Sequence, residues 1–113
     1  MGAVWSEQRK LDNWLEVELA VVDALAEAGL VPAQDADAIR ERAAFTVDAV
    51  KEREKITDHD VAAFVDVLAA SVGPAGRWIH FGLTSSDVLD TALALQLRRA
   101  GEIILAGARE LVE

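Results

Sequence analysis

Residues 84–113 have the sequence TSSDVLDTALALQLRRAGEIILAGARELVE, and this stretch decides the fold. The hydroxyl residues and Asp87 at its start are typical of a helix N-terminus, and no proline follows them. The pattern therefore predicts a single helix of about 28 residues, or ~42 Å, that continues to the end of the chain.

Apolar residues lie around most of the circumference of this predicted helix. One stripe contains Leu93, Leu97, Ala100, Ile104 and Leu111, and neighbouring angles contain Leu95, Ile103, Leu105 and Val112. A helix with this distribution is normally buried on several sides, and residues 1–83 can cover only one of them. We therefore expect the chain to be the front of a longer protein, or to form an oligomer through this helix.

Residues 1–83 also show helical periodicity, so we predict an all-α fold with a helical amino-terminal domain at 1–83 and a long helix at 84–113. The predicted helices before residue 84 span residues 6–28, 33–44, 47–56 and 57–72, and a connector with a short extended piece follows at 74–83. In the first of them the apolar stripe contains Leu11, Leu15, Leu19, Val22 and Leu25, with Trp14 beside it. The sequence Thr57-Asp58-His59-Asp60 fits a capping box at the start of the last of them.

The composition limits the classes of function. The 113 residues include 20 acidic and 11 basic side chains, for a net charge of −9, and no cysteine. Without cysteine the chain has no disulfide, thiolate metal site or cysteine nucleophile, and the excess of acid argues against nucleic-acid binding. The first 20 residues are charged along their length, which is unlike a signal peptide. No apolar run approaches the roughly 18–20 residues that span a bilayer. We therefore expect a cytoplasmic protein that binds neither nucleic acid nor a membrane.

His59 and His80 are the two histidines of the chain, and each lies within a few residues of a predicted helix start. Two isolated histidines without cysteine are too few ligands for zinc, so no metal site is predicted. The composition would allow a Ser-His-Asp triad, but the Gly-x-Ser-x-Gly elbow is absent. On the residues alone, His80 fits a half-buried histidine with a satisfied partner. His59 fits a helix-capping residue or a functional one.

The segment Gly82-Leu83-Thr84-Ser85-Ser86-Asp87 combines a glycine with three consecutive hydroxyl residues at a helix start. Unpaired backbone N–H groups and the positive end of the helix dipole meet at such a position. A cap needs only one hydroxyl group, so the excess favours a small anion site for a carboxylate or a phosphate.

Residues 78–92, WIHFGLTSSDVLDTA, resemble the His-x-Gly-x-Thr-Ser-x-Asp segment of the adenylosuccinate lyases, in the fumarase/aspartase superfamily. Residues 14–18 (WLEVE) and His59-Asp60-Val61 add to the resemblance, which covers essentially the whole chain and the amino-terminal part of the family's protein. The resemblance implies a helical domain followed by the first long helix of a central helical bundle. It also implies β-elimination of fumarate from a succinylated purine nucleotide or its precursor, without a cofactor.

The resemblance further implies a role for each matching residue. The substrate-binding residues that it implies are Asp58, His59, Asp60, His80, Thr84 and Ser85. Among them His59 contacts the substrate and supports the acid, so it is the expected catalytic residue. His80 corresponds to a histidine that holds the phosphoryl group, and Ser86 and Asp87 shape and cap the turn.

Parts of the family's machinery are not expected in this chain. Asp58 stands where relatives often have Arg or Asn, so a contact there is expected through its backbone. The principal acid histidine and the loop with the base serine lie further along the family's sequence, and three subunits of a homotetramer build each active site. We therefore expect the chain on its own to be inactive.

Two other functions stay open at this point. One is a sister enzyme of the superfamily, such as a carboxymuconate-type cycloisomerase, which has a similar Thr-Ser-x-Asp turn. The other is a non-catalytic helical module that dimerises through residues 86–113.

Overall fold

A computed structural model describes all 113 residues, and it is built from helices without a strand. The elements are η1 (Gly2–Trp5), α1 (Glu7–Glu27), α2 (Ala33–Arg42), α3 (Val47–Thr57), α4 (Asp60–Val72), η2 (Pro74–Trp78) and α5 (Ser85–Val112), where η denotes a 3-10 helix. The all-α prediction is therefore confirmed. None of the helices combines the length and the apolar character that crossing a membrane requires.

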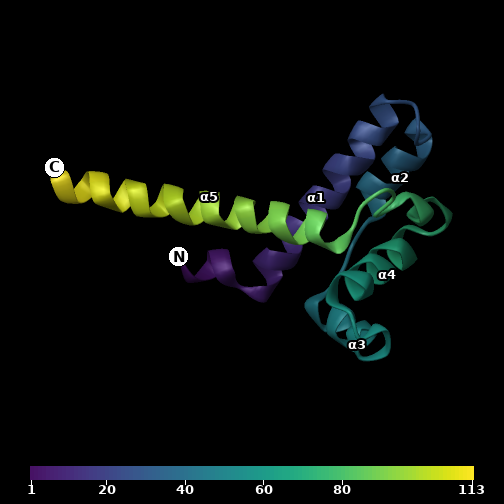
Figure 1. Cartoon of the computed structure of the whole chain (residues 1–113), viewed down its shortest axis with the longest axis horizontal. Helices are drawn as coiled ribbons and strands as arrows, with labels where there is room; N and C mark the ends of the chain where they lie inside the picture. The colour runs from purple at the N-terminus through teal and green to yellow at the C-terminus, as the bar shows by residue number, and fades with distance from the viewer.

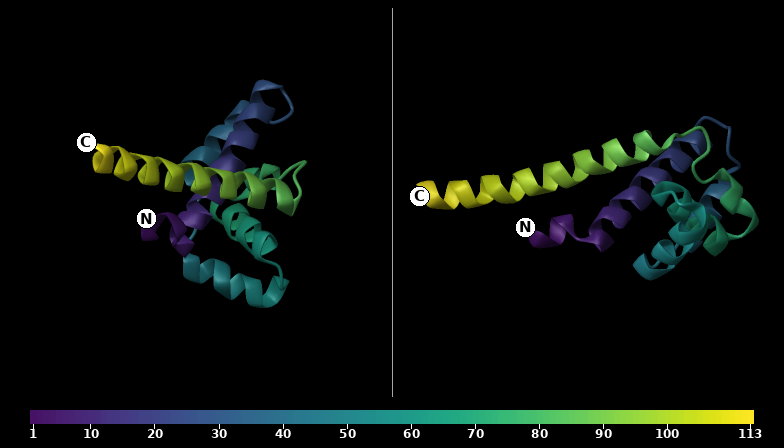
Figure 2. Two further views of the ribbon diagram at one scale, coloured as in Figure 1. Left: turned by 60° about the vertical axis from the view of Figure 1, so that its left-hand side comes forward. Right: turned by 60° about the horizontal axis from the view of Figure 1, so that its bottom comes forward.

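Helix α5 extends as a long arm beyond the other helices (Figures 1 and 2). Its first half packs on α1 and η1 through residues spaced by four, one helical turn apart: Val88, Ala92, Gln96 and Ala100. The Gln96 side chain donates a hydrogen bond to the carbonyl oxygen of Val4 at 3.1 Å, which ties η1 to the arm. No residue after Ala100 is buried.

The predicted apolar stripe of this helix is largely uncovered. Leu97 and Ile104 are 56% and 62% exposed, and Leu93 and Leu111 are exposed as well. Ala100 is the member of the stripe that is buried. Residues 1–83 thus cover one side of α5, as the sequence predicts, and leave a second apolar side open.

The core lies where α1, α2 and α4 meet. Phe64 of α4 is fully buried between Trp14 and Phe45, with edge-to-face ring contacts at centroid distances of 5.5 and 5.2 Å. Such aromatic pairs stabilise a core beyond the area that they bury. Helix α3 packs beside α4, and Arg53 bonds to Asp66 across the pair at 3.0 Å. The charged residues 51–55 lie on the exposed side of α3.

An exposed ion pair joins α2 to α1. The Arg40 guanidinium bonds to Asp23 of α1 and to Asp37 at 3.0 Å. The hydrogen bond to Asp23 raises the pKa of Arg40 above its usual range. Because these side chains are exposed, the pair contributes little to stability.

Helix α1 begins and ends as predicted. The Ser6 hydroxyl accepts a hydrogen bond from the Arg9 backbone N–H at 3.1 Å, and Gly29 has a positive φ of 79° just past the end. The buried face differs from the predicted one. Its members are Leu11, Asn13, Trp14, Val17, Glu18 and Val22, whereas Leu15, Leu19 and Leu25 are only partly buried. The face is shifted because α1 packs against both α2 and α5.

The predicted capping box at residues 57–60 is wrong. Helix α3 continues to Thr57, and Asp58 takes the left-handed conformation that ends it, with φ 54°. The N-cap of α4 is His59, whose Nδ1 accepts a hydrogen bond from the Ala62 backbone N–H at 3.1 Å. The Thr57 hydroxyl instead bonds to the carbonyl oxygen of His59. Only two residues, Asp58 and His59, thus separate α3 from α4.

The predicted extended piece at residues 74–83 is also wrong, because the segment begins with the 3-10 helix η2 and continues in turns. The Trp78 indole N–H donates to Asp35 of α2 at 2.9 Å and anchors the segment. Gly76 packs so closely on α4 that an added Cβ would lie 2.6 Å from the Ala69 carbonyl oxygen. Only glycine permits this approach.

Gly76→Ala should therefore lower the free energy of unfolding by about 1–3 kcal/mol, since the clash is with backbone that cannot rotate away. Gly101→Ala is the matched control, because its Cβ would meet nothing within 4 Å. Because Gly101 lies in the exposed half of α5, Gly101→Ala should raise the free energy of unfolding by up to about 1 kcal/mol. Urea denaturation of both variants measures the difference, and equal midpoints would show that the contact at Gly76 is looser than described.

Candidate active site

The starts of α4 and α5 meet at a contact between His59 and Ser85. The Nε2 atom of His59 lies 3.3 Å from the Ser85 hydroxyl oxygen, although the residues are 26 positions apart. Thr84 is the N-cap of α5, and its backbone N–H donates to the Asp87 carboxylate at 3.0 Å. His59, Thr84 and Ser85 are all at least partly accessible. Two helix N-termini with their positive dipole ends therefore converge on an open surface.

The hydrogen bonds of His59 determine where its ring holds a proton. A backbone N–H can only donate, so the contact from Ala62 makes Nδ1 an acceptor without a proton. The neutral ring then carries its proton on Nε2, which donates to the Ser85 hydroxyl oxygen. Ser85 is left with its own O–H to donate outward, as the binding of an anion requires.

The two aspartates beside His59 differ in their contacts. Asp60 accepts a hydrogen bond from the Val61 backbone N–H at 2.8 Å and lies 3.7 Å from His59 Nδ1. Asp58 is exposed at the left-handed turn between α3 and α4. At this position it adds negative charge to a surface whose helix dipoles favour an anion.

His80 lies in the turn that leads from η2 into α5, and its φ of 67° is left-handed. Its Nδ1 atom is 2.6 Å from a carboxylate oxygen of Glu18 in α1, and 21% of its side chain is exposed. The prediction of a half-buried histidine with a satisfied partner is confirmed. No hydrogen bond or ion pair joins His80 to His59 or Ser85, so the chain brings only the latter two into direct contact.

Glu18 is the residue of this region that sequence reasoning missed. It is 1% exposed, and it lies on the buried face of α1 between Trp14 and Val22. Its spacing could have revealed it: Glu18 lies four residues from both Trp14 and Val22, on the helix face where an apolar side chain is usual.

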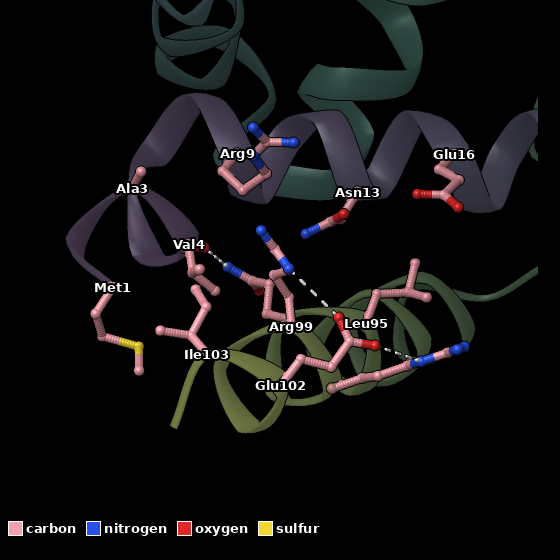
Figure 3. A pocket seen from close by; sticks show the side chains of 12 residues that line it. Met1, Ala3, Val4, Arg9, Asn13, Glu16, Leu95, Arg99, Glu102 and Ile103 are labelled. Carbon is pink, nitrogen blue, oxygen red and sulfur yellow. Dashed lines mark hydrogen bonds and ion pairs between the residues drawn. The ribbon is translucent and has the colours of Figure 1, made fainter. Parts of the chain in front are cut away.

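A hollow of the chain lies elsewhere, between η1, α1 and the middle of α5 (Figure 3). It has a volume of about 490 Å³ and contains none of the predicted site residues. Arg98 and Arg99 line it, and both bond to Glu102, at 3.3 and 3.4 Å. Their charges are thus partly neutralised. No group of three or more acidic or histidine side chains is placed to hold a metal ion.

Comparison with known families gives a match over the entire chain. The family described as Lyase matches residues 1–113. The chain belongs to this lyase family. The prediction drawn from residues 78–92 is confirmed, because curated relatives from within the family are adenylosuccinate lyases.

Three relatives show the extent of the similarity. The adenylosuccinate lyase of Bacillus subtilis is 41% identical over 113 residues, that of Aquifex aeolicus 49% over 116, and that of Synechocystis sp. 48% over 113. Each alignment covers 100% of this chain and 26% of the relative. The chain thus spans about a quarter of the length of the curated lyases that it matches.

A solved structure supports the same placement. The fumarate lyase from Mesorhizobium sp. BNC1 superposes with a TM-score of 0.82 at 28% identity. The match covers 90% of this chain and 25% of that one. Most of the helical arrangement described above is thus shared with part of a fumarate lyase.

Proposed function

We propose that the chain is the amino-terminal part of an adenylosuccinate lyase, which eliminates fumarate from adenylosuccinate to give AMP. The same enzyme would cleave the succinylated carboxamide ribotide of purine biosynthesis. The observation that carries the proposal is the contact of His59 with Ser85 at the start of α5, within a chain that is 41–49% identical to three such enzymes.

The chemistry explains why hydroxyl groups at a helix start are useful. In the β-elimination a base removes the proton next to a succinyl carboxylate, and an acid protonates the departing nitrogen. Negative charge then builds on that carboxylate in the carbanion-like intermediate. Donors aimed at the carboxylate stabilise this state more than the bound substrate, so they accelerate the reaction. Thr84 and Ser85 supply these donors, with the Ser85 O–H freed by His59.

The remaining residues have supporting roles in the proposal. His59 contacts the substrate and supports the acid, and His80 holds the phosphoryl group. Asp58 contributes through its backbone, because its carboxylate would repel an anionic substrate. Asp60 lines the substrate side of the first turn of α4, while Ser86 and Asp87 shape the turn before α5.

The proposal includes assembly into a homotetramer in the cytoplasm. The open apolar side of α5, with Leu97 and Ile104 more than half exposed, supports it, because a lone helix seldom leaves such residues in water. Neighbouring subunits would cover this side and bring the acid and base to His59 and Ser85. A polyanionic substrate also needs more cations than this acidic chain supplies.

An assay of the complete protein tests the function directly. Adenylosuccinate should be consumed, and AMP and fumarate should appear in equal amounts by liquid chromatography. A carboxymuconate substrate should be left unchanged. No loss of adenylosuccinate would contradict the proposal. Turnover of the carboxymuconate would favour a cycloisomerase, and inactivity on both would favour a helical dimerisation module.

Ser85→Ala should weaken substrate binding by about 1–3 kcal/mol, the usual loss for a hydrogen bond to a charged group. The readout is the KM for adenylosuccinate, which should rise by about 5- to 150-fold, and kcat should fall as well, because the same O–H stabilises the intermediate more than the bound substrate. Ser6→Ala is the matched control, since Ser6 is also an N-cap hydroxyl but caps α1. It should lower stability without changing KM. An unchanged KM and turnover in Ser85→Ala would remove Ser85 from the site.

A further inference from the structure

Glu18 is a carboxylate buried on an otherwise largely apolar helix face, and its one side-chain partner is His80. Glu18 Oε1 lies 2.6 Å from His80 Nδ1, and the second carboxylate oxygen, Oε2, is buried without any partner. Buried polar atoms are almost always hydrogen-bonded, so an orphaned carboxylate oxygen indicates a function or a bound group.

Stability is a weak reason for the fold to keep this pair. Replacing a buried ion pair by apolar residues of similar volume is often neutral or stabilising. Glu18 lies on a face whose other members include Leu11, Trp14 and Val22, where a leucine would pack well. His80 also holds a left-handed backbone, a conformation that is unfavourable for a non-glycine residue and tends to occur at functional sites. Two unfavourable features thus coincide at one contact.

The geometry of the contact restricts the imidazole. A carboxylate can only accept, so Nδ1 of His80 carries a proton and donates it to Glu18. The contact fixes the plane of the ring. The Nε2 atom makes no hydrogen bond within the chain, and 21% of the side chain is accessible. It is therefore free to contact a ligand.

We propose that Glu18 is a positioning residue for His80: it fixes the orientation of the imidazole, so that Nε2 faces the substrate. The inference rests on the proposed function, since it assigns the partner of a substrate-binding histidine. It extends that function by one residue, because Glu18 itself touches no substrate.

Three variants of the complete protein separate positioning from packing. Glu18→Gln keeps an acceptor for Nδ1 but removes the charge, Glu18→Leu removes both, and His80→Asn removes the imidazole. The KM for adenylosuccinate should rise about 10- to 100-fold in Glu18→Leu and less in Glu18→Gln, with kcat changed by less than about threefold. His80→Asn should match Glu18→Leu, and the double variant should lose no more than either, as residues that act as a unit do.

The melting temperature shows whether the role is only structural. It should fall in Glu18→Leu, because removing one partner leaves the His80 imidazole unpaired, and change less in Glu18→Gln, which keeps an acceptor. A lower melting temperature together with an unchanged KM would mean that Glu18 merely supports the fold, and would overturn the proposal. A KM that rises additively in the double variant would overturn it too.

A spectroscopic measurement keeps this inference separate from the proposed function. In protein labelled with 15N-histidine, the His80 ring is assigned by its absence from His80→Asn. Its Nδ1 should carry a proton in the wild type, whereas His59 Nδ1 should not, since the latter accepts from Ala62. If the wild type fails to cleave adenylosuccinate, the proposed function is wrong, and the spectrum alone then tests whether Glu18 orients His80. An unprotonated His80 Nδ1 would overturn the role of Glu18.

Discussion

Replacing His59 by asparagine should lower the turnover of the complete lyase on adenylosuccinate by about 100- to 10,000-fold, the usual range for loss of a group that takes part in proton transfer. The imidazole that contacts Ser85 is lost, so the hydroxyl is no longer held as a donor. Steady-state kinetics with adenylosuccinate measures the effect. Turnover at the wild-type rate would contradict the role of His59.

Asparagine makes this test clean because it is itself a good N-cap. Its side-chain oxygen can accept the Ala62 N–H that His59 Nδ1 now accepts, so α4 keeps its start. The melting temperature should therefore stay close to that of the wild type. His59→Ala provides the contrast, since it removes both the cap and the imidazole and should also lower stability by about 1 kcal/mol.

The second large effect concerns assembly through α5. Leu97→Asp together with Ile104→Asp should convert the proposed oligomer to monomers and abolish activity, because two charges would be buried in an apolar interface. Both residues lie on the stripe that residues 1–83 leave open. The fold of the single chain should survive, since neither side chain is buried in it.

Light scattering coupled to size exclusion measures the mass. Lys51→Asp is the matched control: it changes the net charge by the same two units, but on the exposed side of α3. It should leave the mass and the activity unchanged. A wild-type protein that is a stable monomer with a sharp melting transition would show that the apolar side of α5 has another purpose.

Helix positions could be predicted from local chemistry wherever one residue acts alone. The predicted ranges 6–28 and 57–72 have ends close to the observed ones, where Ser6 caps α1, Gly29 follows its end and Gly73 ends α4. At residues 57–60 two candidate caps compete, and the pattern favoured Thr57. Asp58 instead adopts the left-handed conformation, so α3 extends to Thr57 and the cap falls to His59.

The candidate site was predictable only in part. The hydroxyl residues at 84–86 indicate an anion site, but no periodicity shows that His59 reaches Ser85 from 26 positions away. That pairing depends on how η2 turns the chain after α4, where the sequence predicts only a connector with a short extended piece. Glu18 was overlooked because a single glutamate in an amphipathic helix usually faces water. Its burial follows from α1 packing between α2 and α5.

The most direct test of the central claim is a crystal structure of the complete lyase in its His59→Asn form with adenylosuccinate bound. We expect a succinyl carboxylate within about 3 Å of the Ser85 hydroxyl oxygen and of a backbone nitrogen in the first turn of α5. A structure in which the substrate is bound elsewhere, and the turn at residues 84–87 faces solvent, would contradict the account.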